Sequence, residues 1–142
     1  MKQITTKSEK QTFSFAKNYA KKLKGGEIIG LIGNLGAGKT IFTKGLAAGL
    51  GIKKTITSPT FVIMKIYKTN YPISNIQYLA HIDAYRIKSA KNLIAIGVEE
   101  YFNRPDTITI IEWADRIKKI LPKKTSYVNL KVKEKIKRLI QY

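Results

Sequence analysis

A glycine-rich octapeptide, GNLGAGKT at residues 33–40, has the pattern Gly-x4-Gly-Lys-Thr. Glycine allows backbone conformations that turn successive N–H groups toward one point, where an anion can bind. The Lys39 ammonium can reach the β- and γ-phosphates of a nucleotide, and the Thr40 hydroxyl is a suitable Mg²⁺ ligand. The pattern therefore predicts a phosphate-binding loop. Its residues are Gly33, Asn34, Leu35, Gly36, Ala37, Gly38, Lys39 and Thr40.

Two carboxylates directly follow apolar runs. Glu112 ends the run TITIIE and Asp83 ends the run YLAHID, in a chain with only 9 acidic residues. A phosphate-binding loop needs acidic residues on a neighbouring strand, where they bind Mg²⁺ and handle the attacking water. This placement favours a metal or water role for both carboxylates.

The residues around these carboxylates carry weaker signals. The segment TSPTF, residues 57–61, lies where nucleotide switches respond to the terminal phosphate. Within it, Thr60 is the candidate switch residue, and Ser58 is expected only to cap the turn before Pro59. His81, the only histidine, is expected to be a strand side chain rather than a base. Trp113 either packs against the nucleotide or fills the core.

The predicted elements occur in the order that such a loop requires. A strand at 27–32 precedes the loop, and a helix follows it from about residue 39 to residue 50. Before them, Ser8 and Gln11 have capping-box spacing at the start of a helix that the Gly25-Gly26 pair ends.

The rest of the chain predicts mostly strands. A β-hairpin is expected from strands 60–67 and 76–83 with Pro72 in its turn, then a helix at 88–97, a strand at 106–113 and two terminal strands within 127–142. These elements predict a single α/β domain over residues 1–142. The predicted fold is a three-layer P-loop NTPase fold with a mixed, mostly parallel sheet flanked by helices, a β-hairpin and antiparallel terminal strands.

Composition limits the classes of protein. The chain has 142 residues, no cysteine and a formal net charge of +18. No apolar run approaches the ~18 residues of a membrane span, and no export signal opens the chain, so cytoplasm is the expected compartment. The lysines are scattered, which favours a genome-wide compositional bias over a dedicated nucleic-acid surface, although tRNA is electrostatically acceptable as a partner.

Five motifs in order, GNLGAGKT, SPTF, HIDAYR, GVEEYF and IIEWADR, closely resemble the TsaE family of small bacterial P-loop ATPases. The resemblance runs from about residue 25 to residue 122. It implies ATP and Mg²⁺ as cofactors and the TsaB and TsaD proteins as partners. Together these proteins install threonylcarbamoyl on adenosine 37 of tRNA, and ATP hydrolysis by the TsaE protein drives turnover of the TsaB–TsaD complex.

The resemblance also implies roles for individual residues. Lys39 would bind phosphates, Thr40 and Glu112 would bind Mg²⁺, and Asp83 would position or deprotonate the attacking water. Thr60 would be the switch residue, and Trp113 matches a position of functional importance. Asn34 and Asp115 depart from the family, which often has Asp and Glu at these two positions. Neither departure changes a ligand of the phosphates or of the metal.

The same residues raise the question of which nucleotide binds, and two other classes of function are compatible with them. No Asn/Thr-Lys-x-Asp element for guanine recognition follows Glu112, so ATP is favoured over GTP. A small-molecule kinase would need an acceptor site and an arginine-bearing lid, and no arginine-rich insertion follows the helix after the loop. A basic tRNA-binding module with a vestigial nucleotide site is the other alternative. Its RNA affinity would fall steeply with salt and would not depend on Lys39.

Overall fold

The computed structural model describes residues 1–58, 63–70 and 75–142. Within them, seven strands form one sheet in the order β1-β7-β6-β2-β5-β4-β3. The strands are β1 Gln3–Thr6, β2 Ile28–Ile32, β3 Met64–Lys68, β4 Tyr78–Asp83, β5 Thr107–Glu112, β6 Ser126–Glu134 and β7 Lys137–Gln141. The helices are α1 Glu9–Ala20, α2 Lys39–Gly49, α3 Ala90–Ala95, α4 Val98–Phe102 and the 3₁₀ helix η1 Ala114–Ile120.

The sheet is mixed, with a parallel centre. Strand β2 is parallel to β5 and β6, and β4 is parallel to β5. The pairs β3–β4, β6–β7 and β1–β7 are antiparallel, so only β3 and β7 run against the other strands of the described sheet. The predicted mixed, mostly parallel sheet, its hairpin and its antiparallel terminal strands are confirmed. Pro72, expected in the hairpin turn, lies outside the described residues.

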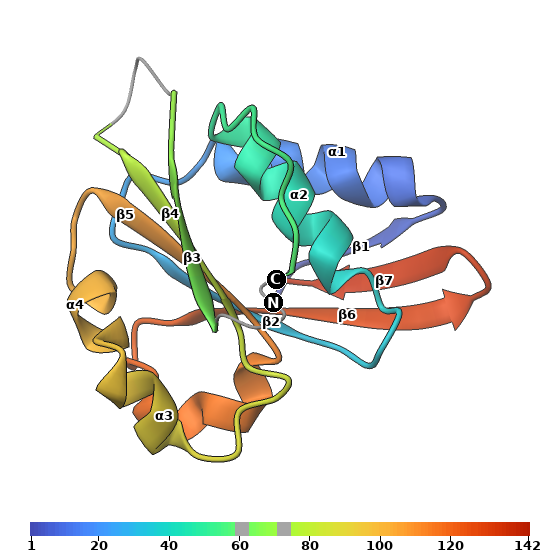
Figure 1. The fold of residues 1–142 in the computed structure, drawn as a ribbon. Helices are drawn as coiled ribbons and strands as arrows, with labels where there is room; N and C mark the ends of the chain where they lie inside the picture. The colour runs from blue at the N-terminus through green and yellow to red at the C-terminus, as the bar shows by residue number, and fades with distance from the viewer. Residues whose placement is uncertain (59–62, 71–74) are drawn as a thin grey trace.

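Helices cover both faces of the sheet, as the predicted three-layer fold requires (Figure 1). Alternate residues of the central strands enter two apolar cores, because successive strand side chains point to opposite faces. On β2, Ile29 belongs to the core under α1 and α2, whereas Ile28 belongs to the core under α3, α4 and η1. None of the described helices is long and apolar enough to cross a membrane.

Helix α1 begins as predicted and ends earlier than predicted. The Ser8 hydroxyl accepts a hydrogen bond from the Gln11 backbone N–H, and the Gln11 side chain accepts one from the Lys7 N–H. The sequence predicted a helix that continues to the Gly25-Gly26 pair, but α1 ends at Ala20. Residues 21–23 instead donate to carbonyls three positions earlier, so the last turn tightens before the glycine pair.

Two glycines of α2 hold this helix against α1. A Cβ atom on Gly45 would lie 2.3 Å from the Phe13 carbonyl oxygen, and one on Gly49 would lie 2.4 Å from that of Lys17. Only glycine allows the two backbones to approach this closely. The contact fixes α2, whose first residues belong to the predicted phosphate-binding loop.

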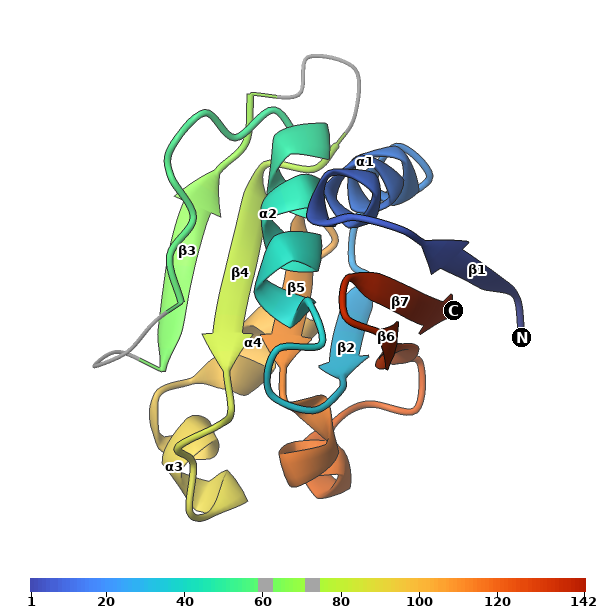
Figure 2. The same cartoon turned by 90° about the vertical axis from the view of Figure 1, so that its right-hand side faces the viewer.

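The carboxyl ends of β2, β4 and β5 meet at one edge of the sheet (Figure 2). The loop to α2 leaves from the end of β2, while Asp83 and Glu112 are the last residues of β4 and β5. In open α/β sheets this edge is where ligands bind, so the predicted functional residues converge at the expected place.

Candidate nucleotide-binding site

The glycine-rich loop leaves β2 and enters α2 through conformations that favour glycine. Gly36 has φ 79° and Gly38, at the helix N-cap, has φ 102°. Gly33 is required for a different reason, because a Cβ atom there would lie 2.6 Å from the Leu130 carbonyl oxygen on β6. The loop therefore rests directly on the neighbouring strand and opens onto the N-terminus of α2, an arrangement that suits anion binding.

Lys39, the first residue of α2, folds its side chain back over this loop. Its Nζ donates hydrogen bonds to the carbonyl oxygens of Gly33 at 2.6 Å and Asn34 at 2.9 Å. It also lies 3.9 Å from the centroid of the Trp113 ring, within cation–π range. Burial lowers the pKa of Lys39, while the negative charges of Glu112, Asp115 and Asp83 oppose this shift. The Lys39 ammonium thus lines the cavity between the loop carbonyls and the Trp113 ring.

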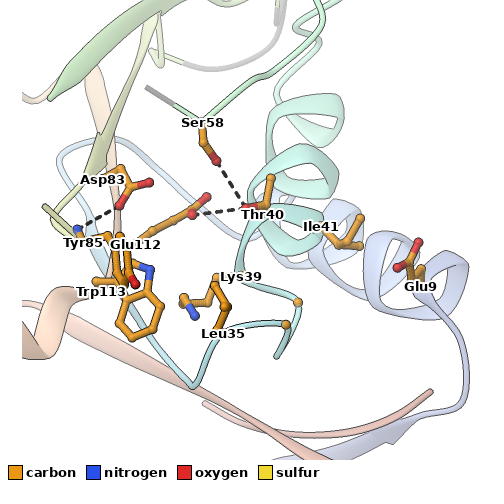
Figure 3. A pocket seen from close by; sticks show the side chains of 12 residues that line it. Glu9, Leu35, Lys39, Thr40, Ile41, Ser58, Asp83, Tyr85, Glu112 and Trp113 are labelled. Carbon is orange, nitrogen blue, oxygen red and sulfur yellow. Dashed lines mark hydrogen bonds between the residues drawn. The ribbon is translucent and has the colours of Figure 1, made fainter. Parts of the chain in front are cut away.

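A cavity of about 300 Å³ lies in front of the loop (Figure 3). Its lining brings together residues from the loop, α2 and the ends of β4 and β5. The lining residues are Glu9, Leu35, Gly36, Gly38, Lys39, Thr40, Ile41, Ser58, Asp83, Tyr85, Glu112 and Trp113.

Glu112 is a buried carboxylate, 2% exposed, whose two oxygens have different partners. Oε2 accepts a hydrogen bond from the Thr40 hydroxyl at 3.2 Å. Oε1 lies 3.1 Å from the Thr43 hydroxyl and 3.1 Å from Nε2 of His81. Thr40 and Thr43 lie on α2, and His81 lies on β4. The carboxylate, at the end of β5, therefore connects the helix after the loop with the neighbouring strand β4.

Asp83 lies next to Glu112 and is partly buried. Its Oδ1 accepts a hydrogen bond from the Tyr85 backbone N–H at 2.9 Å. Burial raises the pKa of Asp83 above its ordinary value, and the Glu112 charge adds to this rise, whereas the Tyr85 hydrogen bond opposes it. Asp83 is therefore a stronger proton acceptor than a free aspartate.

Aromatic side chains form the wall of the cavity beyond the two carboxylates. The rings of Tyr85 and Trp113 lie 4.8 Å apart, and the Arg116 guanidinium lies 4.9 Å from the Tyr85 ring centroid. Arg116 also donates to the Tyr85 carbonyl oxygen at 2.7 Å. Trp113 has φ 60°, which among the described residues makes it the one non-glycine residue with a positive φ. With this backbone conformation, the residue that follows Glu112 in the sequence places its ring beside Lys39.

Most of the residues predicted from the sequence meet at this cavity, but not all line it. Gly33 and Asn34 instead line a neighbouring cavity beside β6, although their carbonyl oxygens hold Lys39. Ala37 is buried and donates its N–H to the Asn34 carbonyl. Thr60 lies outside the described residues, so its switch role stays a prediction.

The structure adds contacts that the sequence interpretation missed. Thr43 and His81 both contact Glu112, and Ser58 Oγ lies 3.4 Å from the Thr40 hydroxyl. One signal for Thr43 was available, because it stands one helical turn after Lys39. For His81 the sequence showed only that it shares a face of β4 with Asp83, two residues later, and not that it contacts Glu112.

The donor set fits Mg²⁺. Two adjacent oxygen ligands of an octahedral Mg²⁺ at about 2.1 Å lie about 3.0 Å apart. The Thr40 hydroxyl and Glu112 Oε2 are separated by 3.2 Å. No cluster of three or more acidic, histidine or cysteine side chains suited to a metal occurs among the described residues. Mg²⁺ usually takes one or two protein ligands and completes its shell with phosphate and water.

Comparison with known proteins gives one consistent answer. The family model described as "Threonylcarbamoyl adenosine biosynthesis protein TsaE" matches residues 6–140. The tRNA threonylcarbamoyladenosine biosynthesis protein TsaE of Rickettsia typhi is 43% identical over 95% of this chain and 90% of its own length. The protein of that name from Bacillus subtilis is 38% identical over 92% of this chain and 79% of its own.

A solved structure agrees with the sequence relatives. The crystal structure of Bacillus subtilis YdiB superposes with a TM-score of 0.74 at 34% identity, covering 98% of this chain and 83% of that one. The family match spans both carboxylates, the loop and the terminal strands. The chain belongs to the TsaE family of threonylcarbamoyl adenosine biosynthesis proteins.

Proposed function

We propose that residues 1–142 form a Mg²⁺-dependent ATPase that acts in tRNA threonylcarbamoyladenosine biosynthesis. The observation that carries this proposal is the 3.2 Å pairing of the Thr40 hydroxyl with Glu112 Oε2, beside a loop shaped to bind phosphates. The names of the relatives supply the pathway. Within this pathway, hydrolysis would drive turnover of a TsaB–TsaD complex that modifies adenosine 37 of tRNA.

The proposed chemistry divides among four side chains. Lys39 exchanges its two carbonyl partners for the β- and γ-phosphates and balances their charge. Thr40 and Glu112 would hold Mg²⁺, which when bound would neutralise charge on the phosphates. Asp83 orients the attacking water and accepts its proton, a role that its raised pKa supports.

The sequence after α2 favours a partner-coupled ATPase over a small-molecule kinase. The cavity of about 300 Å³ lies at the lower limit of ligand pockets, about 300–1,000 Å³, and so suits a single ligand. No arginine-rich insertion that could close over an acceptor follows α2. Hydrolysis then has its effect on a partner, through the conformational change that other P-loop proteins use.

The test is ATP turnover with and without Mg²⁺ by the chain alone, with the TsaB–TsaD complex, and with that complex and tRNA. We expect slow turnover alone, a changed rate with the complex, and loss of turnover in Lys39→Ala. Lys44→Ala is the matched control, because Lys44 lies on the same helix but outside the cavity lining.

Other outcomes would replace this proposal. Turnover that does not respond to the complex would leave an ATPase with a different partner. ATP consumption matched by phosphorylation of an added nucleoside or metabolite would identify a kinase. Salt-sensitive tRNA binding that is unchanged in Lys39→Ala, without turnover, would identify a tRNA-binding module.

A further inference from the structure

The orientation of the Glu112 carboxylate decides which of its oxygens faces the cavity. Oε2 faces Thr40, the other proposed Mg²⁺ ligand, while Oε1 lies on the interior side with Thr43 and His81. Rotation of the carboxylate would exchange the two oxygens. Some group must therefore hold Oε1 in place.

Thr43 alone is a weak candidate for this task. Its hydroxyl has one hydrogen and two acceptors within reach, the Lys39 carbonyl oxygen at 3.0 Å and Glu112 Oε1 at 3.1 Å. The helical geometry of α2 places the Lys39 carbonyl oxygen within reach of the Thr43 hydroxyl, whatever the position of Glu112. The Thr43 hydrogen is thus shared between the two acceptors.

His81 has a single acceptor instead. Its ring is 0% exposed, and Nε2 lies 3.1 Å from Glu112 Oε1. A carboxylate that binds Mg²⁺, the role proposed for Glu112, only accepts hydrogen bonds, so Nε2 carries the hydrogen of this contact. Nδ1, also buried, has no hydrogen-bond partner among the described residues. Burying a polar ring costs free energy unless its nitrogen atoms form hydrogen bonds. Among the described residues, the hydrogen bond to Glu112 is the contact that offsets this cost for His81.

We propose that His81 is a positioning residue that holds Oε1 of Glu112 and thereby presents Oε2 to Mg²⁺ beside Thr40. The proposal rests on the proposed function, since it concerns the same metal. In this role His81 contacts neither the nucleotide nor the metal. Loss of the His81 side chain should weaken Mg²⁺ binding and leave binding of the metal-free nucleotide nearly unchanged.

The experiment measures calorimetric affinity for a β,γ-imido ATP analogue in excess EDTA and in saturating Mg²⁺. The ratio of the two affinities is the Mg²⁺ contribution. Three variants are compared with the natural chain: His81→Leu removes the donor, His81→Gln places an amide N–H near the position of Nε2, and His81→Asn places one near that of Nδ1. Thr109→Val is the control, because it removes a buried β5 hydroxyl that has no partner among the described residues.

We expect His81→Leu and His81→Asn to lower the Mg²⁺ contribution about 10-fold or more, the usual effect of removing a partner of a metal ligand. In all variants the affinity in EDTA should stay within about 2-fold of the natural chain, and His81→Gln and Thr109→Val should keep most of the Mg²⁺ contribution. This pattern would support positioning through the N–H group.

Four results would overturn the inference. An unchanged Mg²⁺ contribution in a folded His81→Leu would show that the contact is dispensable. If that variant does not fold, equal effects of Gln and Asn would show that the ring packs without positioning the carboxylate. A parallel loss in EDTA and in Mg²⁺ would mean a general disturbance of the site. No Mg²⁺ contribution in the natural chain would instead remove the metal from the proposed function, and this inference with it.

Discussion

Asp83 and Glu112 are direct neighbours in the parallel pairing of β4 with β5, and each is the last residue of its strand. This register places two carboxylates side by side at the edge where the phosphate-binding loop begins. Their surroundings differ, since Glu112 is 2% exposed and has several hydrogen-bond partners, whereas Asp83 is only partly buried. Two neighbouring carboxylates can take different chemical roles when their surroundings differ.

Glu112→Gln should abolish Mg²⁺-dependent turnover. The substitution keeps the size of the side chain but removes the negative charge proposed to bind the metal. We expect kcat to fall at least about 100-fold, which corresponds to about 2.7 kcal/mol in the barrier. Steady-state ATP hydrolysis measures this, with Glu100→Gln on the exposed face of α4 as the control. Full activity in Glu112→Gln would contradict the metal assignment.

Asp83→Asn should change how stability depends on pH. Because burial raises the folded-state pKa above the ordinary 3.8, the folded protein binds more protons than the unfolded one between these two values. The contribution of Asp83 to the stability of the natural chain therefore falls as pH rises through this window. The variant lacks this contribution, so its stability relative to the natural chain should increase across the window and then stay constant. Urea denaturation over a pH series measures the difference, and a difference independent of pH would contradict the raised pKa.

Local features of the sequence were sufficient to predict the loop and its helix. The glycines, Lys39 and Thr40 lie within one octapeptide, and their conformations depend mainly on residues close in the chain. The apolar runs that end at Asp83 and Glu112 likewise identified β4 and β5. These elements belong to the centre of the sheet, where burial on both faces leaves a clear apolar pattern.

Features that depend on distant parts of the chain were not predicted. Strand β1 has only four residues, of which three are exposed, and its partner is β7 at the other end of the chain. The contact of His81 with Glu112 joins residues 31 positions apart, so neither local sequence contains it. The positive φ of Trp113 was also not expected, because residues other than Gly, Asn, Asp and His rarely adopt it.

Gly33→Ala should impair nucleotide binding because the new methyl group would meet the Leu130 carbonyl oxygen at 2.6 Å and Ala37 Cβ at 2.9 Å. The loop must then move away from β6, and the carbonyl that holds Lys39 moves with it. We expect ATP affinity to fall more than about 10-fold with a stability loss of about 1–3 kcal/mol.

Gly97→Ala provides the matched control for this change. Gly97 has φ 78° with open space around it, and it caps α4 away from the cavity lining. Its replacement should cost about 1–2 kcal/mol of backbone strain but leave ATP affinity unchanged. Equal losses of affinity in the two variants would show that the Leu130 contact has no special effect on the loop.

Gly45→Ala should destabilise the protein although alanine is the better helix former. Propensity alone would favour alanine by about 1 kcal/mol. However, the new Cβ atom would lie 2.3 Å from the Phe13 carbonyl oxygen and 2.8 Å from Ala16 Cβ, so α1 and α2 must separate. We expect a net loss of about 1–3 kcal/mol in the free energy of unfolding, measured by urea denaturation. Ser14→Ala, at an exposed position of α1, should have the opposite sign because only propensity acts there. A stabilised Gly45→Ala would show that this helix contact does not depend on glycine.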